Sequence, residues 1–463
     1  MSDFTTVVNP ATERAIAEVP RQGIEDVDAA VARSLQAGPA WRSLAPTDRA
    51  RLLRRLADKV EDHAEELAQL ETRNVGKPIA ESRDEVGMVA EVFHFYAGTV
   101  DKHRGATVPV AGGVDLTFHE PLGVVAAIVP WNFPIAIMSW KVGPALATGN
   151  TIVVKPAEIT PLTARRLAEL ALDAGIPEGV LQVVVGQGSV VGTRLVEHPD
   201  VAKVAFTGST EVGRQVMVRA SGTIKRVTLE LGGKSASVIF ADADLERAAA
   251  ATPAGVFANA GQDCCARSRV LVQRSVLDRY LVLVEQAVGQ WTVGDPTDPR
   301  IKMGPLVSAG HRRAVEGFLD PGMGDPDGGP VPAFARGTVP EGPGFWFPPT
   351  VVAPADPGWR LSREEIFGPV VAVIPFDDEE DAVALANDTP YGLSGSIWTR
   401  DGARALRMAR AVQSGNLSVN SHSSVRVQTS FGGMKQSGFG RELGLEALAS
   451  YSDVKNVFIA TED

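Results

Sequence analysis

One pattern recurs between residues 123 and 231: a short run of apolar residues, then a longer segment with helical spacing. The apolar runs are GVVAAIV, TIVVK, LQVVVG, KVAFTG and RVTLEL, and single helical segments lie between them. Strands that are joined by single helices form parallel βαβ units. The pattern therefore predicts an α/β chain with a doubly wound parallel sheet.

A second series of the same kind follows in the C-terminal half. SASVIF, SRVLVQ and VVAVIPF are predicted strands, and helical segments follow the second and the third of them. Apolar residues at helical spacing also predict helices over 48–70 and 80–100, ahead of the first sheet. We therefore expect two α/β domains, with the helical N-terminal region in the first. The Gly- and Pro-rich residues 320–332 are predicted to form a surface loop of the second domain.

Residues 106–121, ATVPVAGGVDLTFHEP, alternate around Gly112 and Gly113. This alternation predicts a β-hairpin, and a loop with a tight turn is the alternative. A hairpin placed between helical segments often protrudes and pairs with another subunit.

The composition excludes several classes of partner. The formal net charge is −11, from 45 Lys and Arg against 56 Asp and Glu. Nucleic acids and anionic membranes need a basic face, so neither is expected as a partner. The most apolar stretch, residues 122–138, is interrupted by Pro130, Asn132 and Pro134, and it is too short to span a membrane. A buried strand, a turn and a helix are expected there instead.

The chain has two cysteines, Cys264 and Cys265, side by side in GQDCCARSR. They cannot form a disulfide framework, and no Cys or His spacing indicates a metal site. The first twenty residues lack the pattern of a signal peptide, so we expect a reducing cytoplasm. Each cysteine could be a small core residue, but Cys264 lies in a polar loop rather than in an apolar run. A thiolate in such a loop is a candidate nucleophile.

Two further motifs contain candidate catalytic side chains. In LELGGK, Glu230 ends an apolar strand, and ligands of α/β sheets bind at the carboxyl ends of strands. In VPWNFP, Asn132 lies between two prolines, and a fixed side-chain amide is a good donor to a developing oxyanion. Taken alone, Glu230 could be a solvated strand end and Trp131 a core residue.

Three motifs are candidates for phosphate or ribose binding. KPAE, which begins at Lys155, follows a strand, and FTGSTEVG leads from a strand into a helix whose first N–H groups could face a phosphate. GQGSVVG is glycine-rich, but its spacing differs from the usual dinucleotide fingerprint. Glycines in such turns are also common for packing reasons.

In this order the motifs resemble the NAD(P)-dependent aldehyde dehydrogenase superfamily over nearly the whole chain, from NPATERAIAEVP to VKNVF. VPWNFP, KPAE, FTGSTEVG, LELGGK, GQDCCARSR and EEIFGPV carry the resemblance. It implies that Cys264 is the nucleophile, that Glu230 is the general base, and that Asn132 binds the oxyanion. Cys265 is then a neighbour of the catalyst.

The resemblance also implies a set of cofactor-binding residues. Lys155 and Glu158 would hold the adenosine ribose, Ser209 the pyrophosphate, and Glu365 the nicotinamide ribose, with Phe367 beside the nicotinamide. The whole set comprises Pro130, Trp131, Lys155, Glu158, Gly188, Ser209, Val212, Leu231, Gly232, Glu365 and Phe367. Lys141 and Glu442 match a buried pair that would act as a proton relay or as a structural ion pair.

The implied reaction oxidises an aldehyde to a carboxylic acid through a thiohemiacetal and a thioester on Cys264. Glu230 would activate the water that hydrolyses the thioester, so transfer to coenzyme A is not expected. This chemistry suits a cysteine of low pKa and a buried glutamate of raised pKa. Glu158 would bind both ribose hydroxyls and repel a 2′-phosphate, so NAD is expected over NADP.

The implied fold has a Rossmann-type NAD-binding domain over residues 1–105 and 121–231 and an α/β catalytic domain over residues 232–425. A small β oligomerisation element would comprise residues 106–120 and 445–463 and would form a homodimer or homotetramer.

The substrate pocket is expected to involve the helix IAIMSWK, Trp131, the surroundings of Cys264 and the loop 421–431. The segment KQSGFGRELG most resembles the betaine-aldehyde and aminoaldehyde branch, and an aromatic wall of Trp140 and Phe431 would suit an ammonium group. Arg426 would instead favour an acidic semialdehyde. A general aliphatic or aromatic aldehyde is a further alternative.

A structural protein and a simple esterase are two alternatives to an aldehyde dehydrogenase. A structural protein without turnover would be expected to lack the nucleophile, the base or the oxyanion donor, and all three are present. A simple esterase would need the cysteine but not the cofactor motifs.

Overall fold

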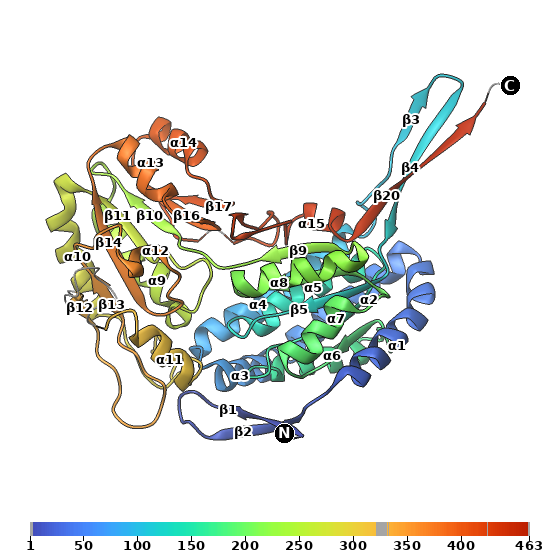
Figure 1. Cartoon of the computed structure of the whole chain (residues 1–463), viewed down its shortest axis with the longest axis horizontal. Coiled ribbons are helices and arrows are strands. Elements are labelled where there is room, and N and C mark those ends of the chain that lie inside the picture. The colour runs from blue at the N-terminus through green and yellow to red at the C-terminus, as the bar shows by residue number, and fades with distance from the viewer. Residues whose placement is uncertain (1–2, 321–330, 332, 424, 462–463) are drawn as a thin grey trace.

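The computed structural model describes residues 3–320, 331, 333–423 and 425–461. Most of the loop predicted at 320–332 therefore lies outside the described residues. The described part contains two large sheets that lie side by side, with a long three-stranded ribbon projecting from one end (Figure 1).

The first sheet has the strand order β19-β9-β8-β5-β6-β7. Its five predicted strands are all present and all parallel, which confirms the doubly wound sheet. They are β5 (Val124–Ile128), β6 (Thr151–Lys155), β7 (Leu181–Val183), β8 (Val201–Thr207) and β9 (Arg226–Glu230). The short antiparallel strand β19 (Gly438–Phe439) was not predicted, and it brings the C-terminal region against β9.

Helices connect these strands. They are α5 (Pro134–Ala147), α6 (Leu162–Asp173), a π-helix at Gly188–Gly192 that continues into α7 (Thr193–Glu197), and α8 (Thr210–Ala220). Every residue of α5 is buried, which explains the apolar stretch at 122–138. Among the described residues, no helix is long and apolar enough to cross a membrane.

Four helices precede the sheet: α1 (Ile24–Ser43), α2 (Pro46–Asp62), α3 (Ala64–Val75) and α4 (Ile79–Thr99). The prediction of one helix over 48–70 was wrong, because the chain breaks between α2 and α3 at His63. The His63 backbone has φ −110° and ψ 18°, and its N–H and its ring Nδ1 both lie near the Lys59 carbonyl. The helical spacing of the apolar residues continues through His63, because α2 and α3 each bury one face in the same hydrophobic core.

The second sheet has the order β12-β13-β14-β11-β10-β16-β17, with only the edge strand β12 antiparallel. Its strands are β10 (Ala236–Ile239), β11 (Arg269–Gln273), β12 (Ala333–Arg336), β13 (Thr350–Val352), β14 (Val370–Phe376), β16 (Ser394–Trp398) and β17 (Asn416–Val419). Its helices include α9 (Leu245–Phe257), α10 (Leu277–Gly289), α11 (Ala309–Glu316), α12 (Arg360–Arg363), α13 (Glu379–Asn387) and α14 (Gly402–Ala411).

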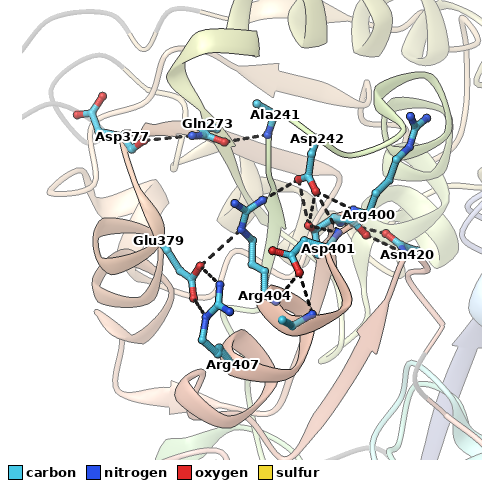
Figure 2. Close-up of polar contacts among 12 residues, drawn as sticks. Ala241, Asp242, Gln273, Asp377, Glu379, Arg400, Asp401, Arg404, Arg407 and Asn420 are labelled. Carbon is cyan, nitrogen blue, oxygen red and sulfur yellow. Dashed lines mark hydrogen bonds and ion pairs between the residues drawn. The ribbon is translucent and has the colours of Figure 1, made fainter.

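A polar network around Asp242 fastens α14 to the end of β10 (Figure 2). The Asp242 carboxylate accepts hydrogen bonds from the Thr399 hydroxyl, from the backbone N–H groups of Arg400 and Asp401, and from Arg404 Nη1. Asp401 caps the helix by accepting from the Ala403 and Arg404 N–H groups. Burial alone would raise the pKa of Asp242, but these donors and the Arg404 charge outweigh it and lower the pKa.

The predicted hairpin is confirmed as β3 (Thr107–Val110) and β4 (Gly113–Pro121), and β20 (Ser452–Ala460) pairs antiparallel with β4 over its full length. Figure 1 shows this ribbon extending away from both sheets. Near the start of the chain, β1 (Phe4–Val8) and β2 (Ala15–Pro20) pair antiparallel and form an N-terminal ribbon. The short elements β15 (Tyr391–Gly392), β18 (Met434–Lys435) and α15 (Glu446–Ala449) complete the chain.

The chain crosses from the first sheet to the second in the five residues between β9 and β10. The domain ranges 1–105 with 121–231, 232–425, and 106–120 with 445–463 stay a prediction. The motif LELGGK lies at this crossing, so its glycines are positioned between the two sheets.

Candidate active site

A cavity of about 250 Å³ brings together motifs from five parts of the sequence. The half-buried Cys264 lies in its wall, in the loop that precedes β11. The other wall residues are Pro130, Trp131, Asn132, Phe133, Ile137, Thr207, Gly208, Ser209, Glu230, Leu231, Gly232, Glu365 and Phe367. The three predicted catalytic residues therefore share one cavity, at the carboxyl ends of β5, β8 and β9, where α/β sheets bind ligands.

The loop before Cys264 has an unusual backbone. Asn259, Ala260 and Gly261 have φ values of 48°, 56° and 70°, so three successive residues are left-handed. Such residues cost energy unless their surroundings hold them in place. Here the Asn259 side chain donates to the Asn132 carbonyl at 2.9 Å, and the half-buried Glu81 carboxylate accepts from the Asn259 N–H at 3.0 Å.

Asn132 is linked to the same loop through its side chain. Its buried Nδ2 donates to the Gln262 carbonyl at 2.8 Å. An amide nitrogen carries two hydrogens, so one remains for a ligand in the cavity. The bond fixes the amide beside the loop that contains Cys264.

The two glycines of LELGGK allow close contacts that any larger residue would block. A Cβ at Gly232 would lie 2.3 Å from Glu365 Oε2, and one at Gly233 would lie 2.4 Å from the Cys264 carbonyl oxygen. The Gly233 N–H donates to Glu365 Oε1 at 2.8 Å. Burial raises the pKa of Glu365 to about 7, although the Gly233 hydrogen bond and Lys234 oppose this shift.

Glu230 ends β9 as a buried carboxyl group, and in the described part of the chain neither of its oxygens has a hydrogen-bond partner. Burial and the nearby Glu442 raise its pKa well above the usual range, while Lys141 and Arg441 act in the opposite direction. This agrees with the expectation of a raised pKa. A carboxyl group of this kind can accept a proton near neutral pH.

Lys141 and Glu442 form a buried ion pair beside Glu230. Lys141 Nζ also donates to the Thr207 hydroxyl at 2.8 Å, and Thr207 lines the cavity. The structure thus brings this predicted pair next to Glu230, the predicted base. The geometry is compatible with both the relay and the structural ion pair.

The expectation of a low pKa for Cys264 disagrees with the structure. The hydrogen bond with the Cys265 side chain, burial and the Asp263 carboxyl raise the pKa of the Cys264 thiol well above its usual range. The loop is polar in sequence, but the fold shields the thiol from solvent and places the Asp263 carboxyl close to it. The thiol therefore needs a base in order to become nucleophilic.

A second cavity, of about 280 Å³, contains other predicted cofactor residues. Gly188, Ser189, Val212 and Val216 lie in its wall with Ile128 and Phe206. Ser209 is the N-cap of α8 and lines the first cavity, next to the free N–H groups of the first helical turn. Apolar walls and a helix N-terminus suit a planar base and a phosphate respectively.

Lys155 and Glu158 are not among the described wall residues of either cavity. Lys155 lies beside the second one, since a Cβ at the wall residue Gly192 would be 3.9 Å from its Cδ. Burial lowers the pKa of Lys155, and Glu158 opposes this shift. Glu158 pairs with Arg21 from the N-terminal ribbon.

Aromatic rings surround the predicted nicotinamide end. Trp131 packs edge-on against Phe367, with centroids 5.3 Å apart, and against His311, 5.1 Å apart. His311 Nε2 lies 2.7 Å from the Phe367 carbonyl oxygen, and Phe367 has a φ of 58°. His311 thus supports the strained residue that positions the ring.

The predicted substrate residues divide into buried and exposed ones. Trp140 and Phe431 pack edge-on at 5.2 Å, but both rings belong to the hydrophobic core and neither is in the cavity wall. Arg426 is exposed and donates to the Ser423 hydroxyl. Phe133 does line the cavity, and Lys77 Nζ lies 4.2 Å from its ring centroid.

Sequence reasoning missed four residues near the site: Arg21, Asp263, Gln262 and His311. Gln262 and Asp263 precede Cys264 directly, so their closeness to it was visible in GQDCC. Arg21 and His311 come from remote segments without a motif, and only the fold brings them to the site.

Comparison with known proteins agrees with this geometry. Residues 2–457 match the sequence profile of the "Aldehyde dehydrogenase family". The "NADP/NAD-dependent aldehyde dehydrogenase PuuC" of Escherichia coli (strain K12) is 43% identical over 98% of this chain and 92% of its own. The betaine aldehyde dehydrogenase of Bacillus subtilis (strain 168) is 39% identical over 99% of this chain and 94% of its own.

A solved structure extends the likeness to three dimensions. The betaine aldehyde dehydrogenase of Staphylococcus aureus in complex with NAD+ superposes with a TM-score of 0.96 at 36% identity and covers 100% of this chain and 92% of its own. Sequence profile, relatives and fold agree over essentially the whole length. The chain belongs to the aldehyde dehydrogenase family and is an oxidoreductase.

Proposed function

We propose that this enzyme oxidises an aldehyde to a carboxylic acid with NAD, through a covalent thioester on Cys264. The observation that carries the proposal is the single cavity whose wall contains Cys264, Asn132, Glu230 and Glu365. A nucleophile, an amide donor and a partnerless buried base in one cavity are the groups that acyl chemistry on an aldehyde requires.

The first step is attack by Cys264 sulfur on the aldehyde carbon. The pKa of the thiol is raised, so a base must take its proton. Of the two carboxyl groups in the cavity wall, Glu365 accepts from the Gly233 N–H, whereas neither Glu230 oxygen has a partner among the residues that the structure describes. We therefore assign Glu230 as the proton acceptor.

The C–S bond forms as the carbonyl π electrons move to oxygen, and the resulting alkoxide accepts hydrogen bonds from Asn132 Nδ2 and from the Cys264 N–H. Bound NAD supplies the hydride acceptor that converts this thiohemiacetal into a thioester. Glu230 first releases the thiol proton toward the adjacent Lys141–Glu442 pair. The carboxylate that results then takes a proton from water as the water oxygen attacks the thioester carbon. The C–S bond breaks, the acid leaves, and Lys141 with Glu442 lies beside Glu230 to redistribute the proton.

The residues present fit a dinucleotide. Gly232 and Gly233 leave room for Glu365 and for the Cys264 backbone, so a ribose can reach the Glu365 carboxylate. Ser209 places the N-terminus of α8 toward a pyrophosphate, and the cavity that contains Gly188 and Val212 is suited to the adenine. Pro130, Trp131, Leu231 and Phe367 line the nicotinamide end.

We propose an aminoaldehyde or betaine aldehyde as the substrate. The similarity of KQSGFGRELG to that branch and the names of the two betaine aldehyde dehydrogenases support this choice. The cavity contains the aromatic rings of Trp131 and Phe133, which attract an ammonium group. Arg426 favours the alternative of an acidic semialdehyde, but it is exposed and bonded to Ser423.

The test is the rate of NAD reduction with betaine aldehyde, 4-aminobutyraldehyde, succinate semialdehyde, hexanal and benzaldehyde. A higher kcat/KM for the two cationic substrates supports the assignment, and a preference for succinate semialdehyde refutes it. Cys264→Ala should abolish reduction of NAD, whereas the matched Cys265→Ala should keep it. Equal activity of the two variants would refute the assignment of the nucleophile.

We propose that the ribbon β3-β4-β20 joins copies of this chain into a homodimer or homotetramer. Apolar side chains on it are exposed, among them Val454 at 64% and Phe458 at 52%. A strand with a free apolar surface is stable in water when a partner covers it.

We also propose the cytoplasm as the compartment, because both cysteines are free thiols.

A further inference from the structure

The ion pair between Arg21 and Glu158 lies at the adenosine end of the proposed cofactor site. Arg21 Nε is 3.6 Å from Glu158 Oε1, and the side chains are 26% and 25% exposed. The Nε–H is shielded from solvent, yet it donates to no acceptor in the described part of the chain. The contact is thus an attraction between charges that leaves guanidinium donors unused.

The backbone holds Arg21 in this place. Its N–H donates to the Asp3 carbonyl and the Gln22 N–H to the Val185 carbonyl, each at 2.8 Å. The Val185 N–H in turn donates to Gln22 Oε1 at 2.8 Å. Val185 follows β7, which pairs with β6, the strand that ends at Lys155. The N-terminal ribbon therefore fixes Arg21 beside the segment KPAE.

The proposed ribose site contains two positively charged side chains in addition to the Glu158 carboxylate. Glu158 by itself repels a second anion, whereas Arg21 and Lys155 provide two cations against one carboxylate. Burial lowers the pKa of Lys155, with Glu158 opposing, and Lys155 Nζ already donates to the Pro156 carbonyl at 3.0 Å. Arg21 is the second cation, and in the described part of the chain its Nε–H has no acceptor.

We propose that Arg21 is a specificity-determining residue that lets the site accept a ribose 2′-phosphate, so that this chain binds NADP as well as NAD. Arg21 neutralises Glu158 and offers its free N–H groups to the phosphate oxygens. With NAD, Glu158 accepts from the ribose hydroxyls and Arg21 only balances its charge. This inference rests on the proposed dinucleotide function and extends it to the phosphorylated cofactor.

The test measures the Kd of NAD and of NADP by calorimetry, without substrate, for the full chain and three variants. Arg21→Gln removes the charge and keeps the side-chain length, and Arg21→Lys keeps the charge. Arg14→Gln is the control, since Arg14 is an exposed arginine on the same N-terminal ribbon. Arg21→Gln should raise the Kd for NADP about tenfold, the usual effect of losing one charge-assisted bond, and should leave the Kd for NAD nearly unchanged.

Arg21→Lys should restore most of the NADP affinity, and Arg14→Gln should leave both constants unchanged. The NADP affinity of the unaltered enzyme should also fall more steeply with salt than that of Arg21→Gln. Equal changes for NAD and NADP in Arg21→Gln, or no binding of NADP to an enzyme that binds NAD, would overturn the role of Arg21. If neither dinucleotide binds, the proposed function itself fails.

Discussion

Asn132 Nδ2 donates to the Gln262 carbonyl at 2.8 Å, and this bond joins the turn after β5 to the loop that carries Cys264. The two residues are far apart in sequence, and each is held by a further contact with Asn259. The proposed oxyanion donor Asn132 and the loop of the proposed nucleophile Cys264 are therefore positioned by one small set of buried amide groups. Its members are expected to affect the rate of chemistry more than the affinity for substrate.

Replacing Asn132 with Ala should lower kcat by about 100- to 1,000-fold, the usual loss when one oxyanion donor is removed. The Kd of NAD should change little, because Glu365 and Ser209 do not contact this amide. Steady-state kinetics and calorimetry measure the two quantities. A loss of NAD binding as large as the loss in kcat would show that the variant disrupts the cavity as a whole.

Glu230→Gln should slow formation of the thioester, because the Cys264 thiol loses its proton acceptor, and should block hydrolysis of the thioester that forms. Glutamine cannot take a proton from water, so mass spectrometry of the enzyme mixed with NAD and aldehyde should detect acylated Cys264.

In the unaltered enzyme, activity should rise with pH, because the raised pKa leaves Glu230 protonated and inactive at low pH. A hydrolysis rate in Glu230→Gln equal to that of the unaltered enzyme would contradict the assignment of the base.

Gly232→Ala should weaken NAD binding by about tenfold or more, because the new Cβ would lie 2.3 Å from Glu365 Oε2 and would displace a carboxylate that makes charge-assisted bonds. Gly222→Ala is the matched control, since a Cβ there would meet nothing within 4 Å. Calorimetric titration with NAD checks the prediction. Equal affinity of the two variants would mean that the space at Gly232 has no role in the cofactor site.

Asp242→Asn should destabilise the protein by about 1 kcal/mol at pH 7, a small value because the Asp242 side chain is 36% exposed and solvent screens its charge. The pKa of Asp242 is lowered in the folded state, so its stabilising effect is present above the unfolded pKa. The effect disappears as the pH falls through the lower, folded pKa. Urea unfolding at several pH values should show the two proteins converging in acid, and a constant difference would contradict this linkage.

Replacing Val454 and Phe458 together with Lys should shift the protein toward monomers in light scattering, because charges on the ribbon oppose the burial of its apolar surface. Val218→Lys is the control, an exposed apolar residue, 73% exposed, on α8. An unchanged mass in the double variant would exclude the ribbon as the contact between subunits.

Much of the fold followed from local patterns. The five strands of the first sheet were predictable because each buried parallel strand is a continuous apolar run bounded by a turn. The strands β16 and β17 were missed, because SGSIW and NLSV contain small polar residues that pack between neighbouring strands. The helix over 48–70 was wrong because apolar spacing records which face is buried and not whether the backbone is continuous at His63.

The pKa of Cys264 marks the limit of local reasoning at the site. A thiol in the segment GQDCC has polar neighbours in sequence, and this pattern predicts a lowered pKa. In the fold the Cys265 thiol, burial and the Asp263 carboxyl act on the Cys264 thiol, and each of them raises its pKa. Electrostatics depend on distances through space, which sequence neighbours do not determine.

The sequence by itself determined the α/β class, the order of the catalytic and cofactor motifs, and their family, because these depend on short segments of defined spacing. Only the tertiary structure decided that Cys264, Asn132, Glu230 and Glu365 share one cavity, and that Gly232 and Gly233 make room for it. It alone brought Arg21 to Glu158 and His311 to Phe367. The physical reason is that such contacts arise from how two sheets and a terminal ribbon pack together, and no local pattern in the chain specifies that packing.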